Sequence, residues 1–358
     1  MKKQDLSIII PVYNGQDYIG RCLESVLNQR DIDKYEIIVV NDGSTDETRN
    51  ILGQFANENK NLHIINQKNG GVSVARNNGI RASHGKYITF IDCDDMVGLN
   101  ASALDKYFPQ SSLRRTIGNM SISTIHSIIP LINSVHFDDK YFTNMLHAVY
   151  DTNADVVLGG KITINYDEIY TRRHIYTSDK LYGTTQEDKD TILRQADIRE
   201  NANFALYRRD MLDAHNLRFL VNMHLDEDML FCMLATLYAQ RVATVHDVLY
   251  FYNRHSDTLS NITNQDEKEQ KYKTANIQLF SVLLTELHKQ PKYAKIFTTW
   301  IKEYSHKGER YSFDTGEFPP MDCYQFCDQH ECTGCFIAEA MCENCKKNIA
   351  KYLRYHEK

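Results

Sequence analysis

The stretch LSIIIPVYN, residues 6–14, is an apolar run that ends in a polar turn. An uninterrupted apolar run of this length is typical of a strand buried on both faces, as in a parallel sheet. The period then changes to that of an amphipathic helix. The apolar residues of this helix are Ile19, Cys22, Leu23, Val26 and Leu27. A buried strand followed by such a helix indicates an α/β fold.

The same alternation continues through about the first hundred residues. Further strands are expected at 36–40, 62–65 and 87–91, with helices around 51–55 and 74–82. Ser44 and Glu47 have capping-box spacing, so the Ser44 side chain is expected to cap the second helix. Alternating strands and helices predict a parallel sheet that binds ligands beyond the carboxyl ends of its strands.

Polar residues follow each of the four expected strands. They are Tyr13 and Asn14, then Asn41, Asp42 and Ser44, then residues 69–71, and finally the DCDD run at 92–95. We expect them to line one edge of the sheet. Carboxylates crowded at Asp92, Asp94 and Asp95 repel one another, which indicates a cation; the alternative is a solvated acidic turn or a helix N-terminus.

The stretches IIIPVYNG, EIIVVNDGSTDET, NGGVSVARNNGI and YITFIDCDD resemble the successive signatures of family 2 glycosyltransferases. The resemblance covers about the first hundred residues closely and resumes near Asp138. It implies a GT-A fold, a Rossmann-like nucleotide-binding sheet with helices on both faces. It also implies inverting, metal-dependent transfer of a sugar from a nucleotide diphosphate sugar, with a UDP-sugar as the expected donor. The acceptor would be a hydroxyl of a carbohydrate or lipid-linked molecule in cell-surface polysaccharide or glycolipid synthesis.

The resemblance assigns the nucleotide-binding positions as well. They are Pro11, Val12, Tyr13, Asn14, Asp42, Ser44, Gly71, Arg76, Asp92 and Cys93. Asp42 would accept a hydrogen bond from the base, and Arg76 would face the diphosphate. The alternative for Arg76 is a surface ion pair, which contributes little energy.

The family's D-x-D motif falls on Asp92, Cys93 and Asp94. Carboxylates are the hard oxygen ligands that Mn²⁺ and Mg²⁺ prefer, and the cation would neutralise the leaving diphosphate. The resemblance implies that Asp94 binds the metal and that Asp92 contacts the ribose or assists through water. His255 is either a further metal ligand or an ordinary exposed histidine.

The segment HLDEDMLF, residues 224–231, places Asp226, Glu227 and Asp228 before an apolar helical stretch. Inverting transfer needs a carboxylate that takes the proton from the acceptor hydroxyl. The family's acidic pair matches Glu227 and Asp228, and Asp228 is the expected base, with its proton affinity raised by its neighbour. Asp226 is expected only to cap the helix or to interact with its dipole.

Six of the nine cysteines lie near the end of the chain, where CTGC and CENC have the spacing of a structural zinc site. The expected ligands are Cys332, Cys335, Cys342 and Cys345. Inert or transiently oxidised thiols and an iron–sulfur cluster are the alternatives.

Three regions are expected. Residues 1–262 would form the GT-A domain, 263–322 a helical extension, and 323–358 a Cys-rich module with a basic tail. An insertion at about 98–137 is interpreted as a flap on the acceptor side or as a tolerated surface insertion.

Composition restricts the partners. A net charge of −6 argues against a general nucleic-acid binder. No apolar run is long enough to predict a spanning helix, so a cytoplasmic protein is expected, with peripheral association at the inner face of the membrane as an option. The alternative from another class is a noncatalytic nucleotide-sugar-binding scaffold protein. A sugar nucleotidylyltransferase is disfavoured because PVYNG is neither Gly-rich nor basic.

Overall fold

The computed structural model describes residues 5–99, 139–165, 173–174, 179–194, 202–223 and 225–254, with scattered positions between 275 and 296. Several expectations therefore lie outside the described residues. They concern the insertion from residue 100 onward, His255, most of the helical extension, and the four cysteines Cys332, Cys335, Cys342 and Cys345.

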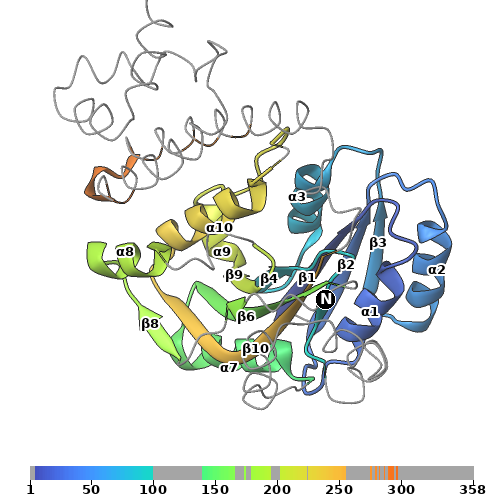
Figure 1. Ribbon diagram of the computed structural model, residues 1–358, viewed down its shortest axis with the longest axis horizontal. Coiled ribbons are helices and arrows are strands. Elements are labelled where there is room, and N and C mark those ends of the chain that lie inside the picture. The colour runs from blue at the N-terminus through green and yellow to red at the C-terminus, as the bar shows by residue number, and fades with distance from the viewer. Residues whose placement is uncertain are drawn as a thin grey trace, which may run out of the picture.

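Four parallel strands form the first half of the sheet (Figure 1). They are β1 (Leu6–Val12), β2 (Tyr35–Asn41), β3 (Leu62–Asn66) and β4 (Tyr87–Phe90). Their spatial order is β3-β2-β1-β4, and every neighbouring pair is parallel. The expected parallel arrangement is confirmed, and the fourth strand ends at Phe90.

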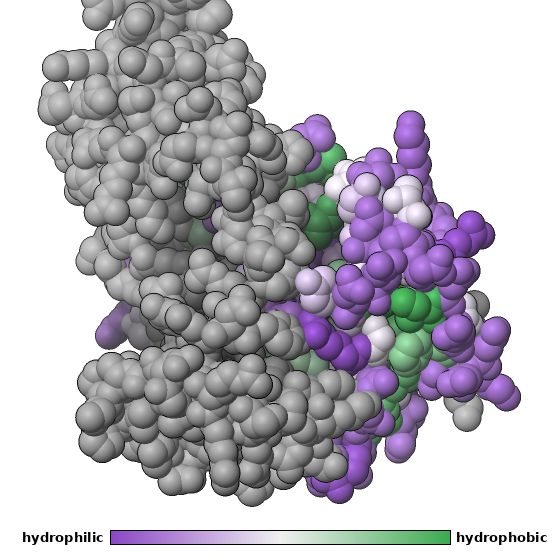
Figure 2. Space-filling model, turned by 45° about the vertical axis from the view of Figure 1, so that its right-hand side comes forward, coloured by the Kyte–Doolittle hydropathy of each residue, from purple (hydrophilic) through white to green (hydrophobic). Residues whose placement is uncertain are grey.

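Helices cover both faces of this half, as expected. They are α1 (Ile19–Leu27), α2 (Thr48–Glu58) and α3 (Val72–Ala82). The apolar sides of α1 and α2 pack on the face that carries Ile8 and Ile10. On the opposite face α3 approaches β1 closely, because a Cβ at Gly79 would lie only 2.3 Å from Cγ2 of Ile9. The described surface of this side of the molecule is mainly hydrophilic in Figure 2, so the apolar sides of these helices are turned inward.

The expected capping box at Ser44 and Glu47 is wrong. Glu47 occupies the N-cap position of α2 without a side-chain capping bond. Ser44 Oγ instead accepts the backbone N–H of Asn14 at 2.9 Å, and Asn14 Oδ1 accepts the N–H of Thr45 at 2.8 Å. The loops after β1 and β2 lie side by side, so the hydroxyl joins the two loops rather than capping the helix.

The second half of the sheet is mixed. It contains β9 (Ala205–Arg208), β6 (Val156–Asn165), β10 (Val242–Arg254) and β5 (Met96–Val97), in that order after β4. β9 runs antiparallel to both β4 and β6, whereas β10 is parallel to β6 and antiparallel to β5. Two short strands, β7 (Arg173–His174) and β8 (Lys180–Tyr182), pair with β6 and β10. This region adds antiparallel pairs that the alternation of the first half does not predict.

The helices of the second half also divide between the two faces. They are α7 (Tyr141–Thr152), α8 (Gln186–Arg194), α9 (Arg209–Ala214) and α10 (Glu227–Tyr238). α7 packs on the same core as α1, and α8 and α10 pack on the opposite core. The described positions of the extension, which include the short helical turn η3 (Pro291–Tyr293), join that second core through Ala275, Leu279 and Ile296. None of the helices described here has both the length and the apolarity to cross a membrane.

Candidate active site

The acidic run forms a tight turn directly after β4. The backbone N–H of Asp95 donates to the carbonyl of Asp92 at 3.0 Å, which leaves Cys93 and Asp94 at the tip of the turn. The turn lies at the carboxyl end of β4, on the edge of the sheet where the loops after β1, β2 and β3 also begin. The four polar segments therefore share one edge of the sheet, as expected.

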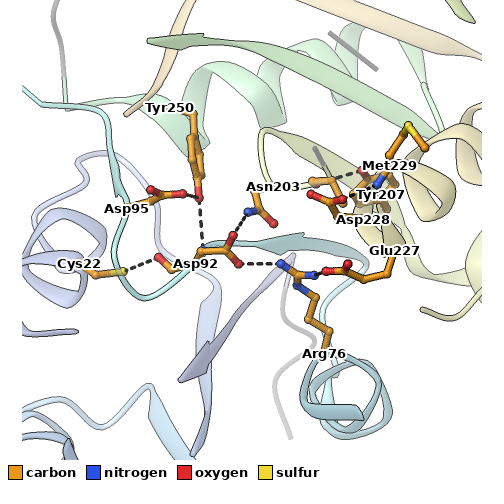
Figure 3. Close-up of polar contacts among 11 residues, drawn as sticks. Cys22, Arg76, Asp92, Asp95, Asn203, Tyr207, Glu227, Asp228, Met229 and Tyr250 are labelled. Carbon is orange, nitrogen blue, oxygen red and sulfur yellow. Dashed lines mark hydrogen bonds and ion pairs between the residues drawn. The ribbon is translucent and has the colours of Figure 1, made fainter. Parts of the chain in front are cut away.

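Asp95 ties this turn to β10. Its buried carboxylate accepts the hydroxyl of Tyr250 at 2.5 Å and the backbone N–H of Asn253 at 2.7 Å. Tyr250 Oη also accepts the N–H of Asp92 at 3.2 Å, so one phenol fixes both ends of the turn (Figure 3). Burial, followed by repulsion from Asp94 and Asp92, raises the pKa of Asp95 well above its ordinary value. Asp95 is thus a structural member of the acidic cluster.

Asp92 is held by two donors. Its Oδ1 accepts from Arg76 Nη2 at 2.7 Å, and its Oδ2 accepts from Asn203 Nδ2 at 2.5 Å (Figure 3). Asn203 is fully buried just before β9 and lies 111 residues away along the chain. The sequence interpretation missed it, because only the antiparallel pairing of β9 with β4 brings it to the turn.

Arg76 lies on α3 and bridges two carboxylates. Besides Asp92, its Nη1 donates to Oε1 of Glu227 at 2.9 Å. The guanidinium also lies over the ring of Phe219, 5.0 Å from its centre. The Arg76 side chain is only 3% exposed, so the alternative of a surface ion pair is wrong.

Asp228 lies in the first turn of α10, next to Glu227. Its Oδ1 accepts the backbone N–H of Met229 at 2.7 Å. Burial, and secondly repulsion from Glu227, raises the pKa of Asp228 to about 8, while the positive charge of Arg76 opposes this shift. The upward direction of this pKa shift agrees with the expectation for a base, although burial contributes more to the shift than the Glu227 carboxylate does. Asp226 occupies the N-cap position but makes no side-chain capping bond.

The loops that carry several predicted nucleotide-binding residues are joined by hydrogen bonds. The Asp42 carboxylate accepts the N–H groups of Gly70 at 2.8 Å and Gly71 at 2.9 Å, and the amide of Gln67 at 2.7 Å. Gly71 has φ 86°, a conformation that favours glycine. Asp42 thus joins the loops after β2 and β3, and its predicted contact with the base stays a prediction.

The other predicted nucleotide-binding residues differ in exposure. Pro11 and Val12 are buried at the end of β1, and Cys93 is partly buried in the acidic turn. Tyr13 is 51% exposed, which leaves its ring available to a ligand.

The carboxylates fit a cation that is shared with a diphosphate better than one enclosed by protein. Within the described ranges, no three His, Cys, Asp or Glu side chains are grouped to hold a metal ion. The Asp92 oxygens accept from Arg76 and Asn203, and Asp95 is buried behind the turn. Asp94 lies at the tip of the turn, and its predicted role as a cation ligand, with diphosphate oxygens completing the shell, stays a prediction.

Comparisons with known proteins bear on the family and the fold. Residues 7–99 match the family model described as Glycosyl transferase family 2. A putative glycosyltransferase, EpsH of Bacillus subtilis, is 29% identical over 306 residues, which cover 84% of this chain and 75% of EpsH. The poly(ribitol-phosphate) beta-glucosyltransferase of Bacillus spizizenii is 42% identical over 99 residues, 27% of this chain and 16% of that protein.

Solved structures support the fold. The crystal structure of S. aureus TarS 1–349 in complex with UDP superimposes with a TM-score of 0.58 at 18% identity, covering 87% of this chain and 75% of the TarS 1–349 chain. At this identity the likeness shows the fold alone. The expected α/β fold of the GT-A type is confirmed. The match of residues 7–99 and the similarity to EpsH show that the chain is similar to family 2 glycosyltransferases.

Proposed function

We propose that the protein transfers a sugar, with inversion, from a nucleotide diphosphate sugar to a hydroxyl acceptor, and that Mn²⁺ or Mg²⁺ assists. The observation that carries the proposal is the meeting of two acidic groups at one edge of the sheet. The D-x-D turn and the Glu227–Asp228 pair come from distant parts of the chain, and Arg76 contacts both. Sugar transfer from the donor to the acceptor hydroxyl would take place between the D-x-D turn and the Glu227–Asp228 pair.

Asp228 would act as the base. A carboxylate with a pKa of about 8 holds a proton more tightly than an ordinary aspartate, which increases the driving force for proton removal from a hydroxyl. The bound cation would supply positive charge to the leaving diphosphate. Asp94 would hold that cation, and Asp92, kept in place by Arg76 and Asn203, would contact the ribose or assist through water.

A UDP-sugar is the proposed donor, and a carbohydrate or lipid-linked molecule is the proposed acceptor. The similarity to TarS, which was crystallised with UDP, supports the first part. The similarity to a poly(ribitol-phosphate) glucosyltransferase supports the second, together with a role in cell-surface polysaccharide synthesis. We also propose a cytoplasmic location, with peripheral association at the inner membrane face.

Asp228→Asn tests the catalytic part of the proposal. The amide keeps the size of the side chain but cannot take a proton, so we expect UDP release from UDP-sugars to fall by about 10²- to 10⁴-fold. UDP affinity, measured by calorimetry, should stay within about threefold because Asp228 lies on the acceptor side. Asp213→Asn, at an exposed ion pair with Arg218, is the control and should behave as wild type.

The same experiment separates the enzyme from the noncatalytic scaffold. A scaffold would bind UDP-sugars without releasing UDP, in the wild type as well as in the variant. Equal UDP release by Asp228→Asn and wild type would exclude Asp228 as the base.

A further inference from the structure

Arg76 connects two parts of the candidate site that are remote in sequence. It lies 16 residues from Asp92 and 151 residues from Glu227. Its Nη2 contacts the carboxylate at the end of β4, and its Nη1 contacts the carboxylate in the first turn of α10 (Figure 3). A planar guanidinium can bridge two carboxylates in fixed directions, whereas an ammonium group presents a single point charge.

The surroundings hold Arg76 in this bridging position. One face of its guanidinium lies over the Phe219 ring, 5.0 Å from the ring centre. Phe219 is itself joined to α3, because its backbone N–H and carbonyl form hydrogen bonds of 2.9 and 2.8 Å with the side chain of Asn77. A charge this deeply buried is tolerated only when it is paired. Removing one partner of a buried ion pair leaves the other charge uncompensated and strongly destabilises the fold.

We propose that Arg76 is a positioning residue, which fixes the start of α10, and with it Asp228, against the donor-side carboxylate Asp92, rather than a ligand of the diphosphate. This inference rests on the proposed function of the same site. Both terminal nitrogens of Arg76 are turned toward protein carboxylates, and the side chain is 3% exposed. A diphosphate ligand would need at least one of these nitrogens to face the donor.

The two charged residues of the bridge, Glu227 and Arg76, act on the pKa of Asp228 in opposite directions. Glu227 raises the pKa of Asp228, and Arg76 lowers it. The other titratable groups that act on Asp228 or feel its charge are Asp226, Tyr207 from β9, Cys232 from α10 and Tyr252 from β10. Removing Arg76 should therefore move the pH dependence of turnover in one direction, and removing the charge of Glu227 should move it in the other.

The experiment compares Arg76→Met with Glu227→Gln. Turnover is measured as UDP release across pH 5 to 10, and UDP affinity by calorimetry with Mn²⁺. In Arg76→Met we expect turnover to fall about 100-fold through misplacement of the base, with UDP affinity within about threefold of wild type. The rising limb of the pH profile should move to higher pH by about one unit in Arg76→Met, and to lower pH in Glu227→Gln.

Two further variants complete the design. Arg81→Met, on the same helix but at an exposed contact with Asn78, is the matched control and should keep both turnover and the pH profile. Arg76→Lys should resemble Arg76→Met in turnover, because one ammonium group cannot bridge both carboxylates. If Arg76→Met does not fold, the turnover and UDP affinity of Arg76→Lys and the pH profile of Glu227→Gln test the inference.

Three results would overturn the inference. They are a loss of UDP affinity of tenfold or more in Arg76→Met or Arg76→Lys, pH limbs that move in the same direction in the methionine and glutamine variants, and a lysine variant that keeps full turnover. Failure of the proposed function gives a different result, because the wild type itself would then release no UDP from any UDP-sugar.

Discussion

The two halves of the sheet contribute to the site by different routes. In the parallel half, β3-β2-β1-β4, each polar segment directly follows its own strand, so the order of the chain already gives its position. In the mixed half, Asn203 and Tyr250 contact the acidic turn although they lie more than 100 positions further along the chain. Glu227 contacts Arg76, which lies 151 positions before it. The first half carries most of the predicted nucleotide-binding residues, and the second half carries the proposed base.

The two halves also differ in the contacts that hold their parts of the site in place. The loops of the first half are joined by several short-range contacts, such as those of Asp42 with Gly70 and Gly71. The acidic turn depends on single side chains from the second half, above all Tyr250 and Asn203. Changes in the first half should therefore act through packing, and changes in the second half through individual hydrogen bonds.

The largest effect on stability is expected for Gly79→Ala, which tests the packing of the first half. The new methyl group would lie 2.3 Å from Cγ2 of Ile9, so α3 must move away from β1. We expect a loss of about 3 kcal/mol in the free energy of unfolding, measured by urea denaturation. Gly53→Ala in α2 is the matched control. Apart from the adjoining backbone of α2, no atom of the described residues lies within 4 Å of its added Cβ, so it should gain about 0.5–1 kcal/mol.

A smaller effect is expected for Tyr250→Phe, which tests the dependence of the turn on the second half. The change removes the donor to Asp95 and the acceptor for the N–H of Asp92, without leaving a large cavity. We expect a loss of about 2 kcal/mol in the free energy of unfolding. Tyr13→Phe, at an exposed tyrosine, should change it by less than about 0.5 kcal/mol. Equal stabilities of the two variants would show that the turn holds without its tie to β10.

The parallel half was predictable because its signals are local. Strand period, helix period and the polar residues after each strand all lie within short windows, and β1 to β4 occur where they were expected. The capping-box prediction was wrong because Ser44 accepts the N–H of Asn14, 30 residues away, and only the packing of the two loops brings these groups together.

The site contacts of the mixed half could not be predicted from such local signals. The position of Glu227 and Asp228 at a helix start was expected, and α10 confirms it. The bridge through Arg76 and the support by Asn203 depend on β9 running antiparallel to β4, and on side chains brought together from α3 and α10. No periodicity in the sequence specifies such contacts. The strand pairing creates them.

The central claim is that the D-x-D turn binds a divalent cation together with a diphosphate. Calorimetry of UDP binding with and without Mn²⁺, in wild type and in Asp94→Asn, tests it most directly. We expect Mn²⁺ to raise the affinity of the wild type for UDP at least about tenfold, and this gain to disappear in Asp94→Asn, because the cation loses its protein carboxylate. An affinity that is the same with and without Mn²⁺, or a gain that persists in Asp94→Asn, would contradict the account.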